Sequence, residues 1–234
     1  MNVYSFSVMQ NHTPKFSRRM LLRGVPAAVG LTALAPALAG CTYESERLAK
    51  ETNTIPNVDL SGIKEQPDIA ALVPKPIRER GLLQNGAATD YAPGEFLNNG
   101  ESVGYDMDVL AAIGKVFGLK TATESAVFAQ IIPSVGPKYD VGLSSFTIDA
   151  ERLKSVNMVS YFEAGVAYAV KAGNPYGIDP HELSGKRPAV QVGTFMEEVA
   201  YEEKAKCDAA GKPTVDVLSY ANNSDAVTNV AGGK

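Results

Sequence analysis

The chain has 234 residues, of which 45% are hydrophobic and 21% are charged. This composition is typical of a globular protein and excludes a disordered or collagen-like chain. Residues 1–40 hold four basic side chains and no acidic one, so the rest of the chain is distinctly acidic. An acidic body argues against nucleic acid as a partner. With two histidines and two cysteines in the whole chain, we expect no metal site, no cofactor and no disulfide framework.

The first 41 residues have the pattern of an export signal. The basic stretch Ser-Arg-Arg-Met-Leu-Leu-Arg, residues 17–23, is followed by a run of small and apolar side chains over residues 25–39. That run contains two prolines and one glycine and is too short to span a membrane stably. The paired arginines resemble a twin-arginine signal, and the general secretory route is the alternative.

The motif Leu-Ala-Gly-Cys, residues 38–41, closes this segment and resembles the lipobox of bacterial lipoproteins. The resemblance implies that Cys41 is the lipidated first residue of the mature protein; the alternative is a plain signal peptide with a chance cysteine. Several acyl chains would hold the protein stably at a membrane. Residues 42–65 are polar and poor in large apolar side chains, so we expect them to form a flexible tether.

Beyond residue 66 the hydrophobic pattern alternates between helical and strand periodicity, which predicts an α/β protein. The clearest helix, over residues 106–117, has its apolar side chains on one face and ends before Gly118. In chain order, the expected elements are a helix over 69–80, a helix over 106–117, strands over 139–143, 166–170 and 188–192, a helix over 196–206 and a strand over 215–220.

Three segments of this pattern carry a family resemblance. They are GESVGYDMDVLAAIGKVFGLK over 100–120, KYDVGLSSFTIDAERLKSVNMVSYFEAG over 138–165 and ELSGKRPAVQVGTFMEE over 182–198. Their order and spacing resemble those of the extracellular solute-binding proteins that deliver amino acids to ABC importers, and most of all the actinobacterial members. The resemblance implies a two-lobe α/β fold of the type II periplasmic-binding-protein (Venus-flytrap) class. Lobe I would span residues 66–172 and part of lobe II residues 173–234, with a ligand cleft that closes between them.

Arg152 matches the arginine that binds the ligand's carboxylate in this family. A buried carboxylate needs a paired cation, and the planar guanidinium can bind one through two hydrogen bonds. Ser145 and Thr147 lie seven and five residues before Arg152, at positions where family members offer backbone and hydroxyl groups to the ligand. On the residues alone, two alternatives stay open: a surface arginine, and a pair of caps for a helix that begins near Asp149.

Thr194 follows Gly193 between an expected strand and an expected helix. The resemblance implies that this threonine closes over the ligand's carboxylate from the second lobe, where the free amides of a helix N-terminus attract the same anion. A simple capping box with Glu197 is the alternative. Tyr91 and Phe128 match positions where family members pack rings or apolar groups against the ligand. For Phe128, core packing is the alternative.

The chain ends at Gly232-Gly233-Lys234, where family members continue into a strand that carries an aspartate for the ligand's ammonium group. We therefore expect an incomplete second lobe, and the chain is then either a fragment or a truncated product without ligand binding. Cys207 has no cysteine partner once Cys41 carries lipid.

The expected function is that of a lipid-anchored binding protein at the extracellular face of the cell membrane. It would bind an amino acid between its lobes and hand it to an ABC permease, and we expect a monomer. We do not expect an enzyme, because His181 is the one histidine beyond the signal and no acid–base pair is visible. A sensory or interaction module on the same fold is the alternative.

Overall fold

The computed structural model describes residues 55–233. The export signal, Cys41 and the first part of the expected tether lie outside the described residues, so these predictions stay predictions. The part of the tether that is described, residues 55–65, contains no helix or strand. Between residues 55 and 233, no helix combines the length and the apolar character that crossing a membrane requires.

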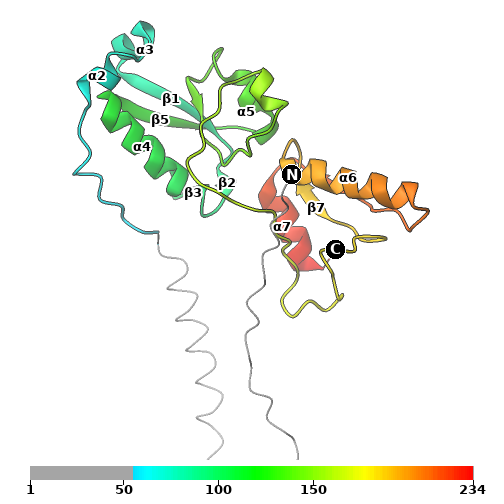
Figure 1. Cartoon of the computed structure of the whole chain (residues 1–234). Coiled ribbons are helices and arrows are strands. Elements are labelled where there is room, and N and C mark those ends of the chain that lie inside the picture. Colours follow the sequence, from blue (N-terminus) through cyan, green and yellow to red (C-terminus); the bar gives the residue numbers. More distant parts are fainter. Residues whose placement is uncertain (1–54, 234) are drawn as a thin grey trace, which may run out of the picture. The chain divides into compact units, whose positions relative to one another are not determined.

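A three-stranded parallel sheet forms the centre of the first lobe (Figure 1). Strand β1 (Leu82–Ala87) is hydrogen-bonded to β5 (Lys120–Ser125) on one side and to β6 (Val141–Gly142) on the other. Parallel neighbours need crossover connections, and helices supply them here. Helix α4 (Tyr105–Phe117) precedes β5, and α5 (Phe128–Ser134) precedes β6. The α/β prediction is confirmed, although β6 is shorter than the strand expected over residues 139–143.

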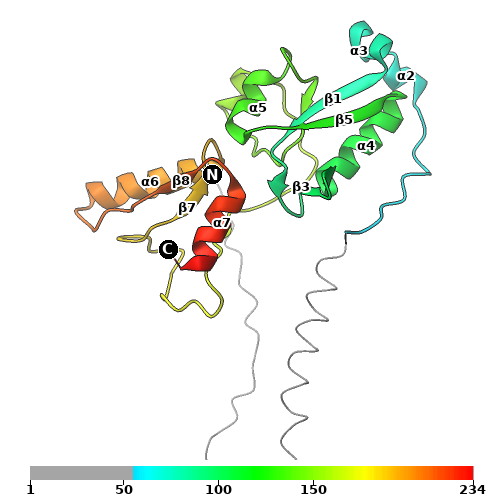
Figure 2. The same ribbon diagram turned by 180° about the vertical axis from the view of Figure 1, so that it is seen from behind.

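Helix α4 agrees with the sequence prediction to within one residue. It begins after Gly104 and ends at Gly118, and both glycines adopt a positive φ, of 120° and 67°, that other residues rarely adopt. Leu110 is buried, and the helix packs along β5 (Figure 2). Asp106 in the first turn is also buried, which is unusual for a carboxylate.

The helix expected over residues 69–80 is divided into two. Helix α2 (Pro67–Ala70) and helix α3 (Lys75–Arg80) are separated by residues 71–74. Pro74 explains the break, because proline disfavours a helical conformation in the residue before it and has no N–H to donate. The prediction of one continuous helix was wrong, whereas its end before Gly81 is confirmed.

A small antiparallel sheet with the order β2-β3-β4 follows β1 along the chain. Its strands are β2 (Asp90–Tyr91), β3 (Glu95–Asn98) and β4 (Glu101–Val103). The first residue of β3, Glu95, has a buried side chain. Next to it, the backbone N–H of Asp106 donates to the carbonyl of Gly94 at 3.0 Å. The small sheet therefore holds Glu95 against the first turn of α4.

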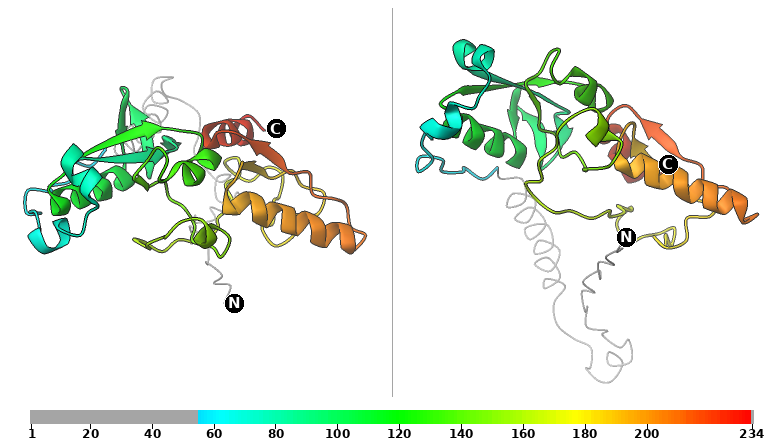
Figure 3. Two further views of the ribbon diagram at one scale, coloured as in Figure 1. Left: turned by 90° about the horizontal axis from the view of Figure 1, so that it is seen from above. Right: turned by 45° about the horizontal axis from the view of Figure 1, so that its top comes forward.

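The second lobe contains a two-stranded parallel sheet and two helices. In chain order these are β7 (Ala189–Gln191), α6 (Phe195–Ala209), β8 (Leu218–Tyr220) and α7 (Asn223–Gly232). Both helices pack against β7 (Figure 3). A small core is formed by Leu183, Cys207 and Val215, and Cys207 is a buried free thiol. The strands expected over 188–192 and 215–220 and the helix expected over 196–206 are confirmed, with both strands shorter and the helix longer.

No strand forms over residues 166–170, where the alternating pattern predicted one. A strand requires a hydrogen-bonded neighbour, and none of the described segments pairs with this one. Val166, Tyr168 and Val170 are accordingly exposed. The prediction was wrong because periodicity reports the pattern of side chains, whereas strand formation also depends on a partner elsewhere in the chain.

Candidate ligand-binding site

Arg152 lies at the centre of the candidate site. It opens the short 3₁₀ helix η1 (Arg152–Lys154), and its side chain is only 10% exposed. Its Nη1 donates to the carbonyl of Thr147 at 2.6 Å, and its Nη2 donates to the carbonyl of Gly193 at 2.9 Å. Both acceptors are neutral. A carboxylate binds a guanidinium more strongly than a carbonyl does, so an anionic ligand can replace or join them.

Asp149 holds the guanidinium in this orientation. Its Oδ1 accepts the backbone N–H of Arg152 at 2.8 Å, and its Oδ2 lies 3.2 Å from Arg152 Nε. The helix expected near Asp149 is therefore a single 3₁₀ turn, and the Asp149 side chain accepts the N–H of its first residue. The alternative that Ser145 or Thr147 caps a helix here is wrong, because no such hydrogen bond from either side chain occurs in this turn.

Two phenylalanine rings flank the guanidinium. Phe128 and Phe146 are tilted against each other with their centroids 4.5 Å apart. The Cζ atom of Arg152 lies 6.0 Å from the Phe128 centroid and 5.7 Å from the Phe146 centroid, within the range of a cation–π contact. Phe128 also packs on Ala88 and Ile131 in the core of the first lobe. It is thus a core residue as well as a neighbour of the arginine.

Thr194 is the N-cap of α6. Its Oγ1 accepts the backbone N–H of Glu197 at 3.2 Å and donates to the carbonyl of Gln191 at 2.7 Å. The Glu197 carboxylate reaches back to the N–H of Gly193 at 2.7 Å, which is a capping box displaced by one residue. The capping alternative for Thr194 is therefore present in the structure. Since Arg152 binds the carbonyl of Gly193, the same turn also belongs to the candidate site.

Ser145 lies in a different environment, beside two buried carboxyl groups. Glu95 is 1% exposed and Asp106 is fully buried. The backbone N–H of Ser145 donates to Asp106 Oδ2 at 2.8 Å. Its Oγ lies 3.0 Å from Glu95 Oε2 and 3.2 Å from Asp106 Oδ2. Ser145 has a φ of 50°, in the left-handed region, and these hydrogen bonds hold it there.

Two tyrosines and a second serine complete this group. Tyr161 donates its hydroxyl hydrogen to Asp106 Oδ1 at 2.7 Å, and the Tyr105 hydroxyl lies 3.1 Å from Ser145 Oγ. Ser144 Oγ donates to Glu95 Oε1 at 2.7 Å. We call Glu95, Asp106, Ser144, Ser145, Tyr105 and Tyr161 the carboxyl cluster.

Burial, reinforced by the charge of Asp106, raises the pKa of Glu95 to about 8. Burial and the hydrogen bond to Asp106 hold the pKa of Tyr161 well above its usual range. Within residues 55–233, no lysine, arginine or histidine forms an ion pair or hydrogen bond with either carboxyl group. A pKa of about 8 keeps Glu95 mostly protonated at neutral pH.

Tyr91 lies in β2 and is 39% exposed. Its neighbour Asp90 accepts the backbone N–H of Ser224, in the first turn of α7, at 3.0 Å. This contact is a hydrogen bond between the two lobes, in addition to the bond between Arg152 and Gly193. An exposed ring at such a position is compatible with ligand contact, which stays a prediction.

The structure thus brings together some of the predicted site residues and separates others. Arg152, the carbonyl of Thr147, Phe128 and the turn before Thr194 lie together, whereas Ser145 belongs to the carboxyl cluster. Sequence reasoning missed Glu95 and the role of Asp106. Asp106 lies in the first turn of a predicted helix, and nothing in the sequence links it to an acid in a separate strand.

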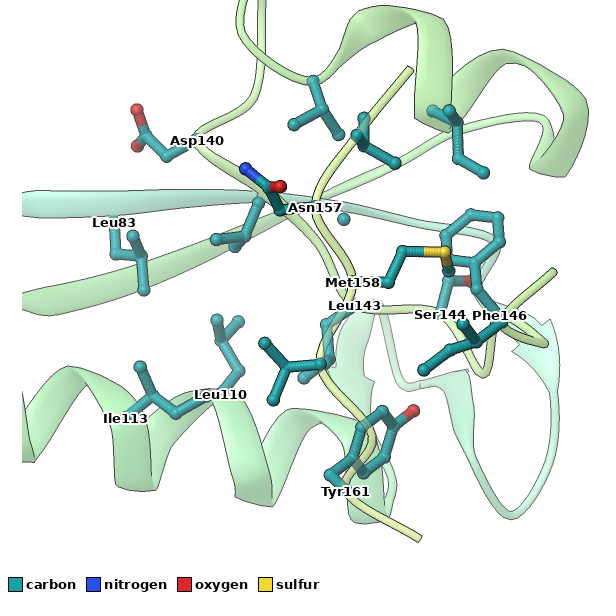
Figure 4. A pocket seen from close by; sticks show the side chains of 17 residues that line it. Leu83, Leu110, Ile113, Asp140, Leu143, Ser144, Phe146, Asn157, Met158 and Tyr161 are labelled. Carbon is teal, nitrogen blue, oxygen red and sulfur yellow. The ribbon is translucent and has the colours of Figure 1, made fainter. Parts of the chain in front are cut away.

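A cavity of about 270 Å³ lies in the first lobe beside the candidate site, with which it shares Phe146. Figure 4 shows its largely apolar lining, which includes Leu110 and Ile113 from α4 together with Phe146, Met158 and Tyr161. None of the six predicted ligand residues lines it. An apolar cavity cannot compensate the desolvation of a carboxylate and an ammonium group, so it is not the candidate site. In the described part of the chain, no three His, Cys, Asp or Glu side chains gather in a way that could hold a metal ion.

Comparison with known proteins gives a family match. Residues 83–229 match the model of the bacterial extracellular solute-binding proteins, family 3. The match begins in β1 and ends in α7, so it includes Arg152, the carboxyl cluster and Thr194.

Individual relatives agree with that match. The arginine-binding protein ArgT of Corynebacterium glutamicum is 31% identical over 91% of this chain and 69% of its own length. The ABC transporter arginine-binding protein 1 of Escherichia coli is 26% identical over 64% of this chain, and the chain spans 58% of that relative's length. Among solved structures, an ancestral amino acid-binding protein, described as a precursor of cyclohexadienyl dehydratase, superposes with a TM-score of 0.61. It is 32% identical and covers 68% of this chain and 69% of its own.

Proposed function

Because the chain belongs to family 3 of the bacterial extracellular solute-binding proteins, we propose that it binds an α-amino acid and delivers it to an ABC permease. Membership of an extracellular family makes it an exported protein. The names of the relatives support an amino acid as the ligand, since ArgT and the Escherichia coli protein are both arginine-binding proteins. Arginine is therefore the first ligand to test.

The observation that carries this proposal is the environment of Arg152. Its guanidinium is nearly buried between two phenylalanine rings, and both terminal nitrogens bind neutral backbone carbonyls. We infer that the ligand's carboxylate takes the place of the Gly193 carbonyl on Nη2 or binds beside it. The exchange is favourable because a bond between two opposite charges replaces a bond from the guanidinium to a neutral carbonyl.

The other predicted residues have defined places in this proposal. Thr194 and the first turn of α6 present N–H groups near the same anion, and Thr147 orients the guanidinium through its carbonyl. Phe128 and Tyr91 would contact the apolar part of the ligand. Ser145 would act through the carboxyl cluster rather than by direct contact, because its N–H and hydroxyl already face Glu95 and Asp106.

Isothermal titration with a panel of amino acids, beginning with L-arginine, tests the proposal. We expect saturable 1:1 binding that Arg152→Ala weakens by about 2–5 kcal/mol of binding free energy. Arg152→Lys keeps the positive charge but loses the planar guanidinium with its paired N–H donors, so it should retain only part of the affinity. Arg80→Ala is the matched control, because Arg80 is ion-paired with Asp140 outside the candidate site.

Two results would contradict the proposal. If the affinity of Arg152→Ala is unchanged, Arg152 is not part of the binding site. If none of the amino acids binds, the proposed class of ligand is wrong. A prephenate-like substrate belongs in the panel as well, since one structural neighbour is described as the precursor of a dehydratase. We expect no turnover of it, because the residues around Arg152 bind an anion but offer no proton donor to it.

We further propose that the mature protein is a monomer held at the extracellular face of the cell membrane by lipid on Cys41. The supporting observations are the Leu-Ala-Gly-Cys motif at residues 38–41 and the polar segment that follows it. The paired arginines at residues 18–19 favour the twin-arginine route of export. A tether over residues 42–65 would then separate the anchor from the two lobes.

A further inference from the structure

The two carboxyl groups of the carboxyl cluster face each other without a cation. Ser145 Oγ lies between them, 3.0 Å from Glu95 Oε2 and 3.2 Å from Asp106 Oδ2. A hydroxyl group has one hydrogen to donate and two lone pairs with which to accept. With both carboxyl groups ionised, Ser145 could donate to only one of them, and two buried anions would remain side by side.

One additional proton makes every hydrogen bond in the cluster consistent. If Glu95 is protonated, its Oε2–H donates to Ser145 Oγ, and Ser145 in turn donates to Asp106 Oδ2. The Tyr105 hydroxyl, 3.1 Å away, donates to the second lone pair of Ser145 Oγ. Asp106 then remains the single anion and accepts from the Ser145 N–H and from Tyr161. A buried polar network of this kind is stable only when all its members are satisfied.

The cluster also holds both ends of the loop that carries Arg152. Asp106 Oδ2 accepts the N–H of Ser145 at the beginning of this loop, and Asp106 Oδ1 accepts the hydroxyl of Tyr161 at its end. Between these two points, Phe146 contacts the guanidinium face and the Thr147 carbonyl accepts from Arg152 Nη1. A single carboxylate thus anchors the segment 145–161 on both sides of the candidate site.

We propose that Glu95 and Asp106 form a proton-sharing carboxyl pair that positions the Arg152 loop, so that loss of the shared proton releases the loop and weakens ligand binding. The proposal rests on the proposed function only for the identity of the ligand, because the carboxyl pair positions the loop whether or not a ligand is bound. Glu95 and Asp106 are positioning residues in this account: they act on the ligand through Ser145 and Arg152 and do not touch it.

The groups that face the pair come from several elements. Asp106 and Tyr105 belong to α4, and Tyr161 belongs to the segment after η1. Burial, together with Asp106 and Glu95, raises the pKa of Tyr105. From β2, Tyr91 contributes to the raised pKa of Tyr105. Both cluster tyrosines therefore stay neutral where Glu95 titrates, and the charge change belongs to the carboxyl pair.

The experiment is an NMR pH titration of the ligand-free protein from pH 6 to 9.5, in the parent and in Glu95→Gln. Glutamine has the shape of the protonated glutamic acid but cannot titrate. We expect the backbone amide shifts of Ser145 and Arg152 to move with a shared midpoint near pH 8 in the parent. In Glu95→Gln, both amide shifts should stay constant over this pH range. A flat profile in the parent, or movement of Ser145 without Arg152, would overturn the proposal.

Binding of L-arginine is measured over pH 6 to 9 on the same proteins. If only the protonated pair is competent to bind, about one tenth of the protein is competent at pH 9, and the parent's affinity falls about tenfold. The affinity of Glu95→Gln for L-arginine should vary by less than about twofold over the same pH range. A fall as large as that of the parent would contradict the proposal. If L-arginine binds at no pH, the proposed ligand is wrong, and the amide titration still decides the role of the pair.

Two further variants separate this role from simple packing. Asp106→Asn removes the neighbouring charge that raises the pKa of Glu95, so the surviving amide titration should shift to lower pH. Asp140→Asn is the matched control, because Asp140 is a largely buried carboxylate paired with Arg80 and not with this cluster. It should leave the Ser145 and Arg152 profiles as in the parent; a changed profile there would show that loss of any buried carboxylate has this effect.

Discussion

Arg152 donates a hydrogen bond from Nη2 to the backbone carbonyl of Gly193 at 2.9 Å, across 41 residues of sequence. The bond joins the 3₁₀ turn η1 to the turn that begins α6. Glu197 binds the N–H of the same glycine at 2.7 Å, so both polar groups of Gly193 are engaged. The position of this one peptide unit therefore matters both for the start of α6 and for the guanidinium that we assign to the ligand.

Replacement of Gly193 should be more costly than its backbone conformation alone predicts. Gly193 has a φ of 77°, and an added Cβ would lie 2.8 Å from the Cβ of Ala129 in α5. The left-handed conformation costs an alanine about 1–2 kcal/mol, and the close approach adds to that cost. We expect Gly193→Ala to lower the free energy of unfolding by more than about 2 kcal/mol in urea denaturation and to weaken L-arginine binding.

Gly177→Ala is the matched control for this substitution. Gly177 has a φ of 56°, but nothing lies within 4 Å of its added Cβ. It therefore carries the conformational strain without the contact and should lose about 1–2 kcal/mol. Equal losses in the two variants would mean that the contact between Gly193 and Ala129 has no energetic role.

Thr194 is expected to stabilise α6 through its hydroxyl group. Thr194→Ala removes the acceptor of the Glu197 N–H and should lower the free energy of unfolding by about 1 kcal/mol. Thr194→Ser keeps the hydroxyl and should stay within about 0.5 kcal/mol of the parent, as measured by urea denaturation. If the serine variant is as unstable as the alanine variant, the threonine acts through its methyl group and not as a cap.

Local signals in the sequence were sufficient to predict some parts of the fold. Helix α4 could be placed because its apolar face and Gly118 lie within one stretch of chain. The capping role of Thr194 was visible for the same reason, since its partner Glu197 is three residues away. Arg152 could be singled out because the motif that surrounds it resembles a known family.

The remaining features depend on residues that are distant in sequence. Tyr161 reaches Asp106 across 55 residues, and Ser145 reaches Glu95 across 50. Neither distance follows from periodicity, which explains why the carboxyl cluster was not predicted. The strand expected over residues 166–170 failed for a related reason, because an alternating pattern does not specify the neighbour that a strand requires.

Cys41, in the expected signal region, is the residue that we propose to carry the lipid anchor. Cys41→Ala should move the mature protein from the membrane fraction to the soluble fraction of its host, because the acyl chains supply the membrane affinity. Cell fractionation with immunodetection measures the effect. Cys207→Ala is the control, since Cys207 is buried in the core of the second lobe. Retention of Cys41→Ala in the membrane would contradict lipidation at this residue.

The stability of the protein should fall as the pH rises from about 4.5 to about 8. Burial raises the pKa of Glu95 from 4.5 to about 8, so between these values the folded state holds a proton that the unfolded state has lost. A state that binds more protons is destabilised as the pH increases, and the free energy of unfolding therefore decreases through this window. Below pH 4.5 both states are protonated at Glu95, and above pH 8 both are ionised, so its contribution to the slope vanishes there.

Thermal unfolding of the parent and of Glu95→Gln across pH 5 to 9 checks this sign. The parent should lose more of its Tm than the variant, and the difference in Tm between them should grow until about pH 8 and then stay constant. A variant that follows the parent's Tm profile throughout would show that Glu95 does not titrate in this range.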